Sequence, residues 1–352
     1  MTICYLNLTS HIPARDTVYL KGFKENGVEI LECRDDSPGP VKFLKLYKKH
    51  KSLGGKYDIM LVGYSAHILV PFARFITSKK VIFNALCSLY EGNIISRGKM
   101  SIFLPFQIIY NWLIDVIAFN SAHLNLLESE EQVKFISKTF LIPRKKLLKA
   151  WTGVDDSLFY NDPEIKKLPA FTVLFRGAFL PESGIEYAVE AARILKDQNV
   201  NLRIVGGKGP LVPMIKKGLE EYKLSNVEWI SGPKISFDEL RRKIQECHLS
   251  LGQLSAHDRL NRTVPHKAYE TMVMRIPYLT ARNKAVLELF KENETCFCCN
   301  PADAENLAKR ILEIKNNPGP AAQVAENAYQ LYTRGLTPKI LAKKVLDFIR
   351  II

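Results

Sequence analysis

Short apolar runs of strand length alternate with helical patterns along the whole chain. In the first half these runs are Ile3–Leu6, Val28–Cys33, Asp58–Val62, Lys80–Asn84 and His123–Leu127. In the second half they are Phe171–Phe175, Asn201–Val205, Val227–Ile230, Leu249–Leu251 and Tyr278–Thr280. Strands that alternate with helices need crossover connections, which produce parallel, doubly wound sheets. The pattern predicts an α/β protein with two Rossmann-like domains that face a cleft.

An aperiodic stretch separates the two series of runs. It reads DDSLFYNDPEIKKLPA, is rich in Asp, Pro and Lys, and is typical of a linker. We therefore expect an N-terminal domain over residues 1–160 and a C-terminal domain over residues 161–336. Residues 337–352 have the pattern of an amphipathic helix, which we expect to pack back on the N-terminal domain. Ligands of such sheets bind at the carboxyl ends of the strands.

The net charge of the chain indicates which kinds of molecule it binds. The chain carries 50 Lys and Arg against 36 Asp and Glu, and its formal net charge is +14. Eleven Lys and Arg but only two acidic residues lie between residues 37 and 114. A basic surface favours an anionic partner, and no zinc-finger spacing, aromatic RNA-binding motif or basic zipper is present. The sequence thus predicts phosphorylated small molecules and an anionic membrane surface as partners, not nucleic acid.

Two segments bear on the membrane. VKFLKLYKKHK, Val41–Lys51, sets apolar residues among lysines, which is typical of a basic helix at a lipid surface or of an ordinary solvated helix. Ser101–Phe119 is mostly apolar, but Gln107, Asn111 and Asp115 recur on one helix face. That polar stripe favours a largely buried helix over a membrane span. We expect a cytoplasmic protein, peripheral at the inner face of the membrane, since no signal-peptide pattern opens the chain.

Cysteine usage agrees with a reducing compartment. Seven cysteines are an odd number and are scattered over the chain, which is not the pattern of a disulfide framework. The run Cys296–Cys299 is too tightly spaced for a zinc site, where cysteines are separated by two to four residues. We therefore expect structural thiols and no metal site there.

The segment NRTVPHKAYETMVMRIPYLTA, residues 261–281, carries the strongest chemical signal. It predicts a loop that enters a helix at Pro265, with Arg262 and Lys267 at a helix start that already favours an anion. Glu270 follows Lys267 by three residues, so both project from one side of the first turn. A cation beside a carboxylate suits a nucleoside diphosphate. An exposed helix start with a plain Lys/Glu pair is the alternative.

VPHKAYETMVMRIPYLTA resembles a motif of the family 4 retaining glycosyltransferases of GT-B fold. Three more segments are similar to motifs of that family and occur in the same order: KAWTGVDDSLF, FRGAFLPESGIEYAVEAARIL and LRIVGGKGPL. A bacterial polysaccharide-biosynthesis subgroup is most similar, through SLYEGNIISRG at residues 88–98. The resemblance implies a glutamate, here Glu270, that holds the nucleotide ribose. It also implies that Arg262 and Lys267 hold the diphosphate, which makes them the catalytic pair.

The remaining donor-binding residues implied are glycines and their neighbours. They are Gly177, Gly207, Lys208, Gly209 and Pro265. Glycine loops allow close approach to a ligand, but they are as frequent in plain strand–helix turns. Arg176 either reaches a phosphate or lies at the surface, and the surface position is slightly favoured. The acceptor side would be lined from the first domain, by Arg15, His67, Glu91 and Arg97, although a buried histidine that contacts backbone is the alternative for His67.

Some positions depart from the family pattern. Ala178 and Ser183 stand where an arginine and a lysine are usual, and Arg262 replaces the glutamate usual eight residues before Glu270. Two interpretations follow from these departures. Either Arg262 and Lys267 have taken over the contacts to the diphosphate, or the protein has lost catalysis.

The resemblance implies a retaining hexosyltransferase that moves a sugar from a nucleotide-sugar, UDP or GDP type undecided, to a saccharide or lipid-linked acceptor in cell-surface glycan biosynthesis. No cofactor is implied beyond this donor, and the absence of an Asp-x-Asp triplet predicts transfer without a divalent metal. The alternatives are a nucleotide-sugar-binding protein without catalysis and another GT-B enzyme, such as an epimerase or phosphorylase.

Overall fold

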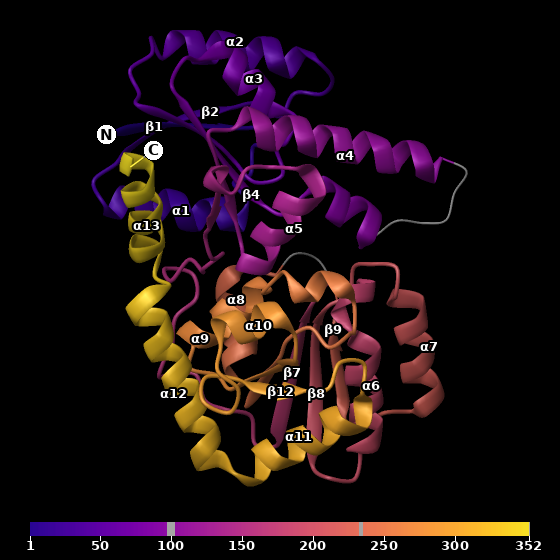
Figure 1. Cartoon of the computed structure of the whole chain (residues 1–352). Helices are drawn as coiled ribbons and strands as arrows, with labels where there is room; N and C mark the ends of the chain where they lie inside the picture. The colour runs from indigo at the N-terminus through magenta and orange to yellow at the C-terminus, as the bar shows by residue number, and fades with distance from the viewer. Residues whose placement is uncertain (97–102, 232–234, 352) are drawn as a thin grey trace. The chain divides into compact units, whose positions relative to one another are not determined.

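The computed structural model describes residues 1–96, 103–231 and 235–351. It divides into two compact units, Met1–Asp155 with Leu336–Ile352, and Asp156–Gly335. Each unit contains a six-stranded sheet surrounded by helices (Figure 1). All the described strand pairings are parallel. The predicted α/β class with two parallel sheets is therefore confirmed.

The sheet of the first unit has the order β2-β1-β3-β4-β5-β6. Its strands are β1 (Thr2–Asn7), β2 (Glu29–Arg34), β3 (Ile59–Val62), β4 (Lys80–Leu86), β5 (Leu124–Leu127) and β6 (Leu147–Lys149). Its helices are α1 (Ala14–Glu25), α2 (Val41–Ser52), α3 (Leu69–Ile76), η1 (Glu91–Ile95), α4 (Leu104–Ser121), α5 (Glu130–Phe140), η2 (Arg144–Lys146) and α13 (Pro338–Ile351). Strands β3 and β5 are buried along their whole length, because helices cover both faces of a doubly wound sheet.

The sheet of the second unit has the order β12-β11-β10-β7-β8-β9. Its strands are β7 (Phe171–Gly177), β8 (Val200–Gly206), β9 (Val227–Ile230), β10 (Leu249–Leu251), β11 (Tyr278–Ala281) and β12 (Phe297–Cys299). Its helices are η3 (Pro181–Ser183), α6 (Ile185–Ile194), α7 (Val212–Tyr222), α8 (Phe237–Gln245), η4 (Asp258–Asn261), α9 (His266–Val273), α10 (Lys284–Leu289), α11 (Ala304–Asn316) and α12 (Pro318–Gly335). The strand order reverses direction between β7 and β10, and that reversal positions the site described below.

The end of the chain packs against its beginning, where α13 lies alongside α1 (Figure 1). Gly22 permits this approach, since a Cβ atom at that position would lie 2.0 Å from the carbonyl oxygen of Pro338. Asn26 holds the same contact with a hydrogen bond from its Nδ2 to the carbonyl oxygen of Lys339, at 2.8 Å. The C-terminal helix is therefore part of the first unit.

Helix α4 differs from its expected environment. A largely buried helix is wrong, because only Asn111, Asp115, Ala118 and Phe119 of α4 are buried, while Phe106, Ile109, Tyr110, Leu113 and Ile117 are exposed. Gln107 of the polar stripe is exposed, whereas Asn111 and Asp115 point inward, where a side chain and two backbone amides bind them, as described below. Among the described residues, no helix is long and apolar enough to cross a membrane.

Candidate functional site

The carboxyl ends of β7 and β10 mark the place where a ligand site is expected. These two strands are hydrogen-bonded neighbours, and the connections that follow them run toward opposite edges of the sheet. Loops diverge at such a switch point, and ligands of doubly wound sheets bind there. Arg176 and Gly177 end β7, and Gly252 follows β10.

An ion pair joins the end of β7 to helix α9. Arg176 donates from Nη1 to Oε2 of Glu270 at 2.5 Å and from Nη2 to Oε1 at 3.1 Å. Glu270 is buried, and burial raises the pKa of its carboxyl group, while the guanidinium of Arg176 opposes the shift by stabilising the carboxylate. The surface position expected for Arg176 is wrong, because Glu270 holds its head group.

Lys267 lies on the first turn of α9, close enough to Arg176 for the two charges to repel. Its Nζ donates to the carbonyl oxygen of Gly252 at 2.8 Å and lies 4.6 Å from the centre of the Phe175 ring. Burial, helped by the charge of Arg176, lowers the pKa of Lys267 to about 7. An exposed helix start with a Lys/Glu pair is thus wrong, since both residues are buried and Glu270 pairs with Arg176 instead.

Arg262 and Pro265 lie on the approach to α9. Arg262 is buried and donates from Nη1 to Oδ2 of Asp258 at 2.7 Å, which lowers the pKa of Asp258. Pro265 is the N-cap residue of α9 and provides no side-chain hydrogen bond to the helix. Arg262 and Lys267 were expected to act together on a diphosphate, but in this structure each is held by a protein acceptor of its own.

The predicted glycine loops meet at the ends of β7 and β8. A Cβ atom at Gly207 would lie 2.8 Å from the Trp229 ring, and one at Gly209 would lie 2.4 Å from the carbonyl oxygen of Phe179. Those two glycines are therefore required by the packing of the loop itself. Gly177 has φ +136°, and a Cβ atom there would meet nothing within 4 Å. Its left-handed backbone faces open space, which a ligand can occupy.

Lys208 occupies the same loop as these glycines. Its side chain is exposed, while its carbonyl oxygen accepts from the amide of Phe179 at 2.8 Å. The loop backbone is therefore fixed and the ammonium group is accessible to an anion.

The arrangement combines cations with one carboxylate. Arg176 and Lys267 face Glu270 in a buried setting, where charge interactions are stronger than in water. Anionic groups of a ligand would balance the surplus positive charge, and the carboxylate oxygens can accept from hydroxyl groups. The geometry thus suits a ligand that carries both phosphates and a sugar.

The first unit does not offer Arg15 to a ligand. Arg15 is buried and donates to Oδ1 of Asn84 at 2.7 Å, to Oγ1 of Thr152 at 3.1 Å and to the carbonyl oxygen of Ala150 at 2.8 Å. These contacts connect α1 to β4 and to the segment after β6. The predicted acceptor-side position of Arg15 is wrong, because the guanidinium is used to hold this unit together.

His67 and Glu91 are buried in the same unit. Nε2 of His67 contacts the carbonyl oxygen of Cys87 at 3.2 Å, and burial lowers the pKa of its ring to about 4. The buried histidine that contacts backbone is therefore the correct alternative. Glu91 is fully buried, and its Oε2 accepts from Nε2 of Gln132 at 2.8 Å. Arg97 lies outside the described residues.

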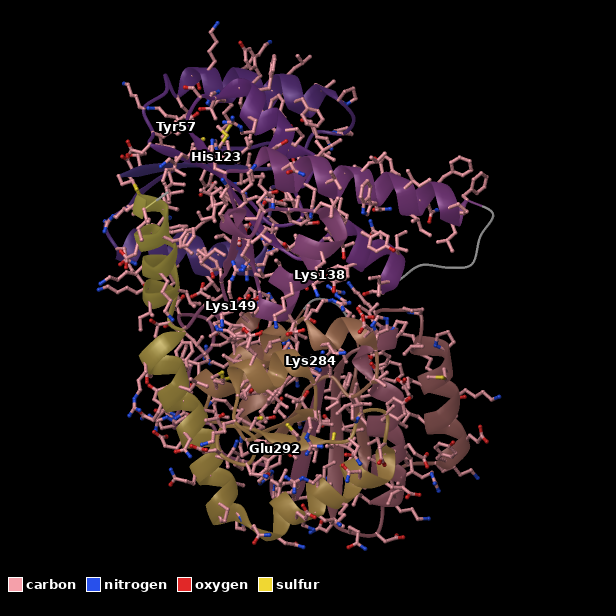
Figure 2. All side chains as sticks on the ribbon, viewed as in Figure 1. Tyr57, His123, Lys138, Lys149, Lys284 and Glu292 are labelled. Carbon is pink, nitrogen blue, oxygen red and sulfur yellow. The ribbon has the colours of Figure 1, made fainter. Side chains whose placement is uncertain are left out.

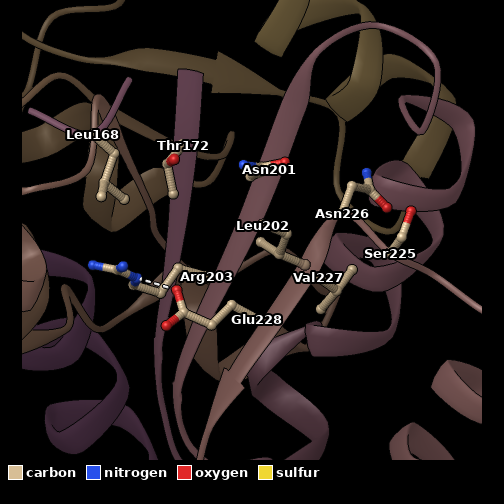
Figure 3. A pocket seen from close by; sticks show the side chains of 9 residues that line it. All are labelled: Leu168, Thr172, Asn201, Leu202, Arg203, Ser225, Asn226, Val227 and Glu228. Carbon is tan, nitrogen blue, oxygen red and sulfur yellow. Dashed lines mark hydrogen bonds and ion pairs between the residues drawn. The ribbon is translucent and has the colours of Figure 1, made fainter. Parts of the chain in front are cut away.

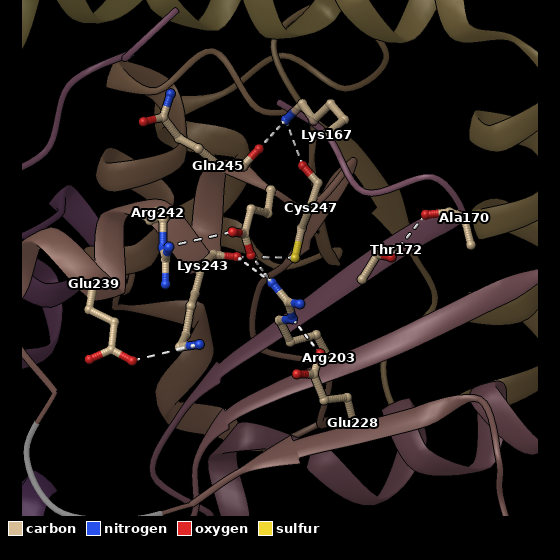
Figure 4. A network of polar contacts seen from close by, with 11 residues as sticks. Lys167, Ala170, Thr172, Arg203, Glu228, Glu239, Arg242, Lys243, Gln245 and Cys247 are labelled. Carbon is tan, nitrogen blue, oxygen red and sulfur yellow. Dashed lines mark hydrogen bonds and ion pairs between the residues drawn. The ribbon is translucent and has the colours of Figure 1, made fainter. Parts of the chain in front are cut away.

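A small pocket opens at the other end of the second unit's sheet. It has a volume of about 120 Å³ and is lined by Arg203 and Glu228 among others (Figure 3). Arg203 donates to Glu228 at 2.6 Å and to Glu246 at 2.5 Å, and Lys167 donates to the carbonyl oxygens of Gln245 and Cys247 (Figure 4). These contacts tie the linker to the sheet. They leave the pocket's charges paired, so we assign it a structural role.

From the sequence, contact of Arg176 with a phosphate is only the less favoured alternative, and the residues after β10 are not indicated. The available signal for Arg176 was its position, as the last side chain before the glycine that ends a buried strand. Gln253 follows Gly252, and its Oε1 atom is buried with no hydrogen-bond partner within the described part of the chain. Over the same residues, no group of His, Cys, Asp and Glu side chains could hold a metal ion.

A family of known proteins matches most of the second unit. Residues 160–331 match the family described as Glycosyl transferases group 1. The match covers just under half of the chain, and it confirms the family resemblance drawn from the sequence.

Particular relatives agree with this assignment. The chain is 27% identical over 171 residues to the putative colanic acid biosynthesis glycosyltransferase WcaL of Escherichia coli K12. That match covers 48% of this chain and 42% of the relative, so it spans less than half of either.

Solved structures support the fold. The structure of HepE from Anabaena in complex with UDP and glucose has a TM-score of 0.75, 16% identity and coverage of 100% of both chains. Sucrose-phosphate synthase from Thermosynechococcus elongatus has a TM-score of 0.77, 14% identity and coverage of 99% and 98%. The expected GT-B fold is thereby confirmed.

The buried Lys267 predicts a measurable pH dependence of stability. The free energy of unfolding should rise between about pH 7 and pH 9, because the unfolded lysine, with its ordinary pKa of 10.5, still binds the proton that the folded one has lost. The slope from this residue is at most about 1.4 kcal/mol per pH unit. Urea unfolding at several pH values should show that Lys267→Met removes this rise.

The matched control is Lys284→Met, at an exposed lysine of α10 (Figure 2). This variant should keep the pH slope of the wild-type protein. Equal slopes for all three proteins would contradict the lowered pKa of Lys267.

Proposed function

We propose that this chain is a nucleotide-sugar-dependent glycosyltransferase of retaining mechanism, which transfers a hexose to a saccharide or lipid-linked acceptor in cell-surface glycan biosynthesis. The observation that carries the proposal is the cluster of Arg176, Lys267 and Glu270 at the switch point of a sheet that lies in the family-matched region. The similar protein WcaL is named for colanic acid biosynthesis, which supports a surface polysaccharide as the product.

The donor we propose carries a nucleoside diphosphate. Its ribose hydroxyls donate to Glu270, and its phosphates approach the open backbone at Gly177 and the ammonium groups of Lys267 and Lys208. A diphosphate beside Lys267 restores the proton that burial has removed, because a nearby anion favours the charged form. UDP-sugars are the first donors to test, since the structure of HepE contains UDP and glucose.

The proposed reaction places the developing negative charge on the leaving diphosphate. Arg262 lies in the segment that enters α9, and release from Asp258 would free its guanidinium for that charge. The leaving phosphate then takes the proton of the acceptor hydroxyl, so no protein base is required. Fixed cations and the amino end of α9 supply the stabilisation.

A binding protein without catalysis is the second candidate. Ser183 and Ala178 support it, because neither residue can supply the cation that is usual there, and Ser183 is buried in the turn before α6. Donor hydrolysis by the purified protein, followed by chromatography of the released sugar, separates the two candidates. A UDP-sugar that binds and is never consumed, with or without acceptor extract, would favour the binding protein.

Substitutions in the cluster should weaken donor binding. Glu270→Ala and Lys267→Ala should each cost roughly 1–3 kcal/mol of UDP-sugar binding, the scale of charged hydrogen bonds lost from a site. Titration calorimetry measures the effect, with urea unfolding alongside because both residues are buried. Glu270→Gln retains the size of the side chain and should also weaken binding.

Glu292→Gln is the matched control, because Glu292 accepts two hydrogen bonds from Arg282 on the same unit, as Glu270 does from Arg176 (Figure 2). It should leave donor affinity unchanged. If the Glu270 and Lys267 variants bind donor as tightly as the Glu292 variant, the site assignment is wrong.

Transfer should need no divalent metal. We expect turnover to persist in excess EDTA with at most a few-fold loss, because Arg176, Lys267 and the amino end of α9 are positioned before the reaction. Turnover that EDTA abolishes and Mn²⁺ restores would contradict both the metal independence and the proposed contacts to the leaving group.

We also propose that the protein is cytoplasmic and peripheral at an anionic membrane surface, where α2 makes the electrostatic contact. Leu46 and His50 face the core, whereas Val41, Leu44 and Tyr47 are exposed among lysines. Each lysine near such a surface contributes about 1 kcal/mol.

The wild-type protein should therefore sediment with anionic but not neutral liposomes and be released above about 0.5 M salt, where charge interactions are screened. Equal partitioning to both lipids, or to neither, would count against this contact.

A further inference from the structure

Helix α4 has its polar and apolar faces reversed. Its inward face carries Asp115, whose oxygens accept from the amides of Leu89 at 3.0 Å and Tyr90 at 2.8 Å. Asn111 on the same face accepts from Nδ2 of Asn93 at 2.9 Å. Asp115 and Asn111 are thus bound by the turn before η1 and by η1 itself, and the opposite face of α4 is left to the exterior.

That outward face is apolar and highly exposed. The exposed fractions are 73% for Phe106, 58% for Ile109, 63% for Tyr110, 46% for Leu113 and 51% for Ile117. Their spacing of three and four residues places them on one side of the helix. The first turns of α4 extend past the rest of the first unit (Figure 1). A face of this kind in a soluble domain marks an interaction surface.

Basic residues outnumber acidic ones in the segments beside this face. Helix α5, which also contacts α4, carries Glu130 and Glu131, but each forms an ion pair, with Arg144 and Lys134 respectively. Between residues 41 and 121 the acidic residues are Asp58, Glu91 and Asp115, of which only Asp58 is exposed. The basic residues on α2 and α3 are Lys42, Lys45, Lys48, Lys49, Lys51 and Arg74. Helix α3 contacts α4, and its Phe75 is 85% exposed. An apolar face in a basic surround is complementary to an anionic lipid surface.

We propose that the outward face of α4 inserts into the boundary between headgroups and acyl chains of an anionic bilayer. This inference rests on the proposed membrane contact of α2 and adds the element that enters the lipid. The helix lies in the plane of the interface, with Asp115 and Asn111 turned toward the protein. Exposed aromatic side chains suit that depth, because rings with a polar tip prefer the membrane–water interface.

Bromine quenching tests the insertion directly. Phe106→Trp in the full-length protein, mixed with vesicles that contain anionic lipid and brominated acyl chains, should lose fluorescence relative to unbrominated vesicles, beyond any loss in the wild-type protein. Phe237→Trp is the matched control, since Phe237 is an exposed phenylalanine of α8 in the other unit. No extra quenching of the Phe106→Trp protein while it sediments with the vesicles would overturn the proposal.

A second pair of variants separates α4 from α2. Leu113→Ser combined with Ile117→Ser should lower the partition coefficient on anionic vesicles about tenfold or more, from the apolar area withdrawn from lipid. Leu287→Ser, at a residue 44% exposed on α10, should leave partitioning unchanged. Unchanged binding of the double variant, with loss only on Lys45→Gln and Lys48→Gln, would overturn insertion and leave the α2 contact standing.

Two further outcomes are decisive. If light scattering shows a dimer that the double variant turns into a monomer, with lipid binding unchanged, α4 is an interface between copies and the proposal fails. If the wild-type protein binds no vesicles but binds UDP-sugar, both membrane proposals fail and the glycosyltransferase proposal is retained.

Discussion

A surplus of buried positive charge at the switch point of the second sheet is the constraint on which the candidate site depends. Arg176 and Lys267 share one carboxylate, Glu270, and burial has already driven the pKa of Lys267 to about 7. A buried cation without a full partner is unfavourable, and an anionic ligand relieves it. The fold supplies the conditions, since β7 and β10 bring the residues together and α9 is buried along nearly its whole length. In the proposed site, stability and donor binding would therefore depend on the same ammonium group.

The first unit uses its corresponding switch point differently. Between β1 and β3, the carboxylate of Asp16 accepts from Tyr5 Oη at 2.6 Å, from Asn84 Nδ2 at 2.6 Å and from the amide of Tyr64. A Cβ atom at Gly63 would lie 2.3 Å from Asn7, so the space is filled. Charged residues near strand ends in this unit stabilise the fold through buried hydrogen bonds. Residue type alone does not distinguish this structural role from ligand binding. Arg15, His67 and Glu91, which the resemblance places on the acceptor side, are buried in this unit and contact protein groups.

The sequence predicted the strands and the parallel class well because buried parallel strands are continuous apolar runs. It missed β6, Leu147–Lys149, as a strand because a three-residue edge strand carries too little pattern. Helix α4 shows a different limit. Periodicity correctly placed Asn111 and Asp115 on one face of the helix. It could not show whether that face points inward or outward, because the direction depends on hydrogen-bond partners in η1 and in the turn before it. Hydrophobic patterning assumes that apolar faces are buried, and the outward face of α4 is exposed instead.

The sequence by itself determined the class of fold, the family resemblance and the segment from Asn261 to Ala281 that carries the site, because strand periodicity, glycines and helix-start residues act locally. Only the tertiary structure decided which charges meet. Glu270 and Lys267 are three residues apart on α9, yet Glu270 pairs with Arg176, 94 residues away. Pairing across a sheet depends on strand order and on which groups are desolvated, and neither is encoded in a local pattern. The sequence therefore named the residue types, and the packing of β7, β10 and α9 decided their protonation and partners.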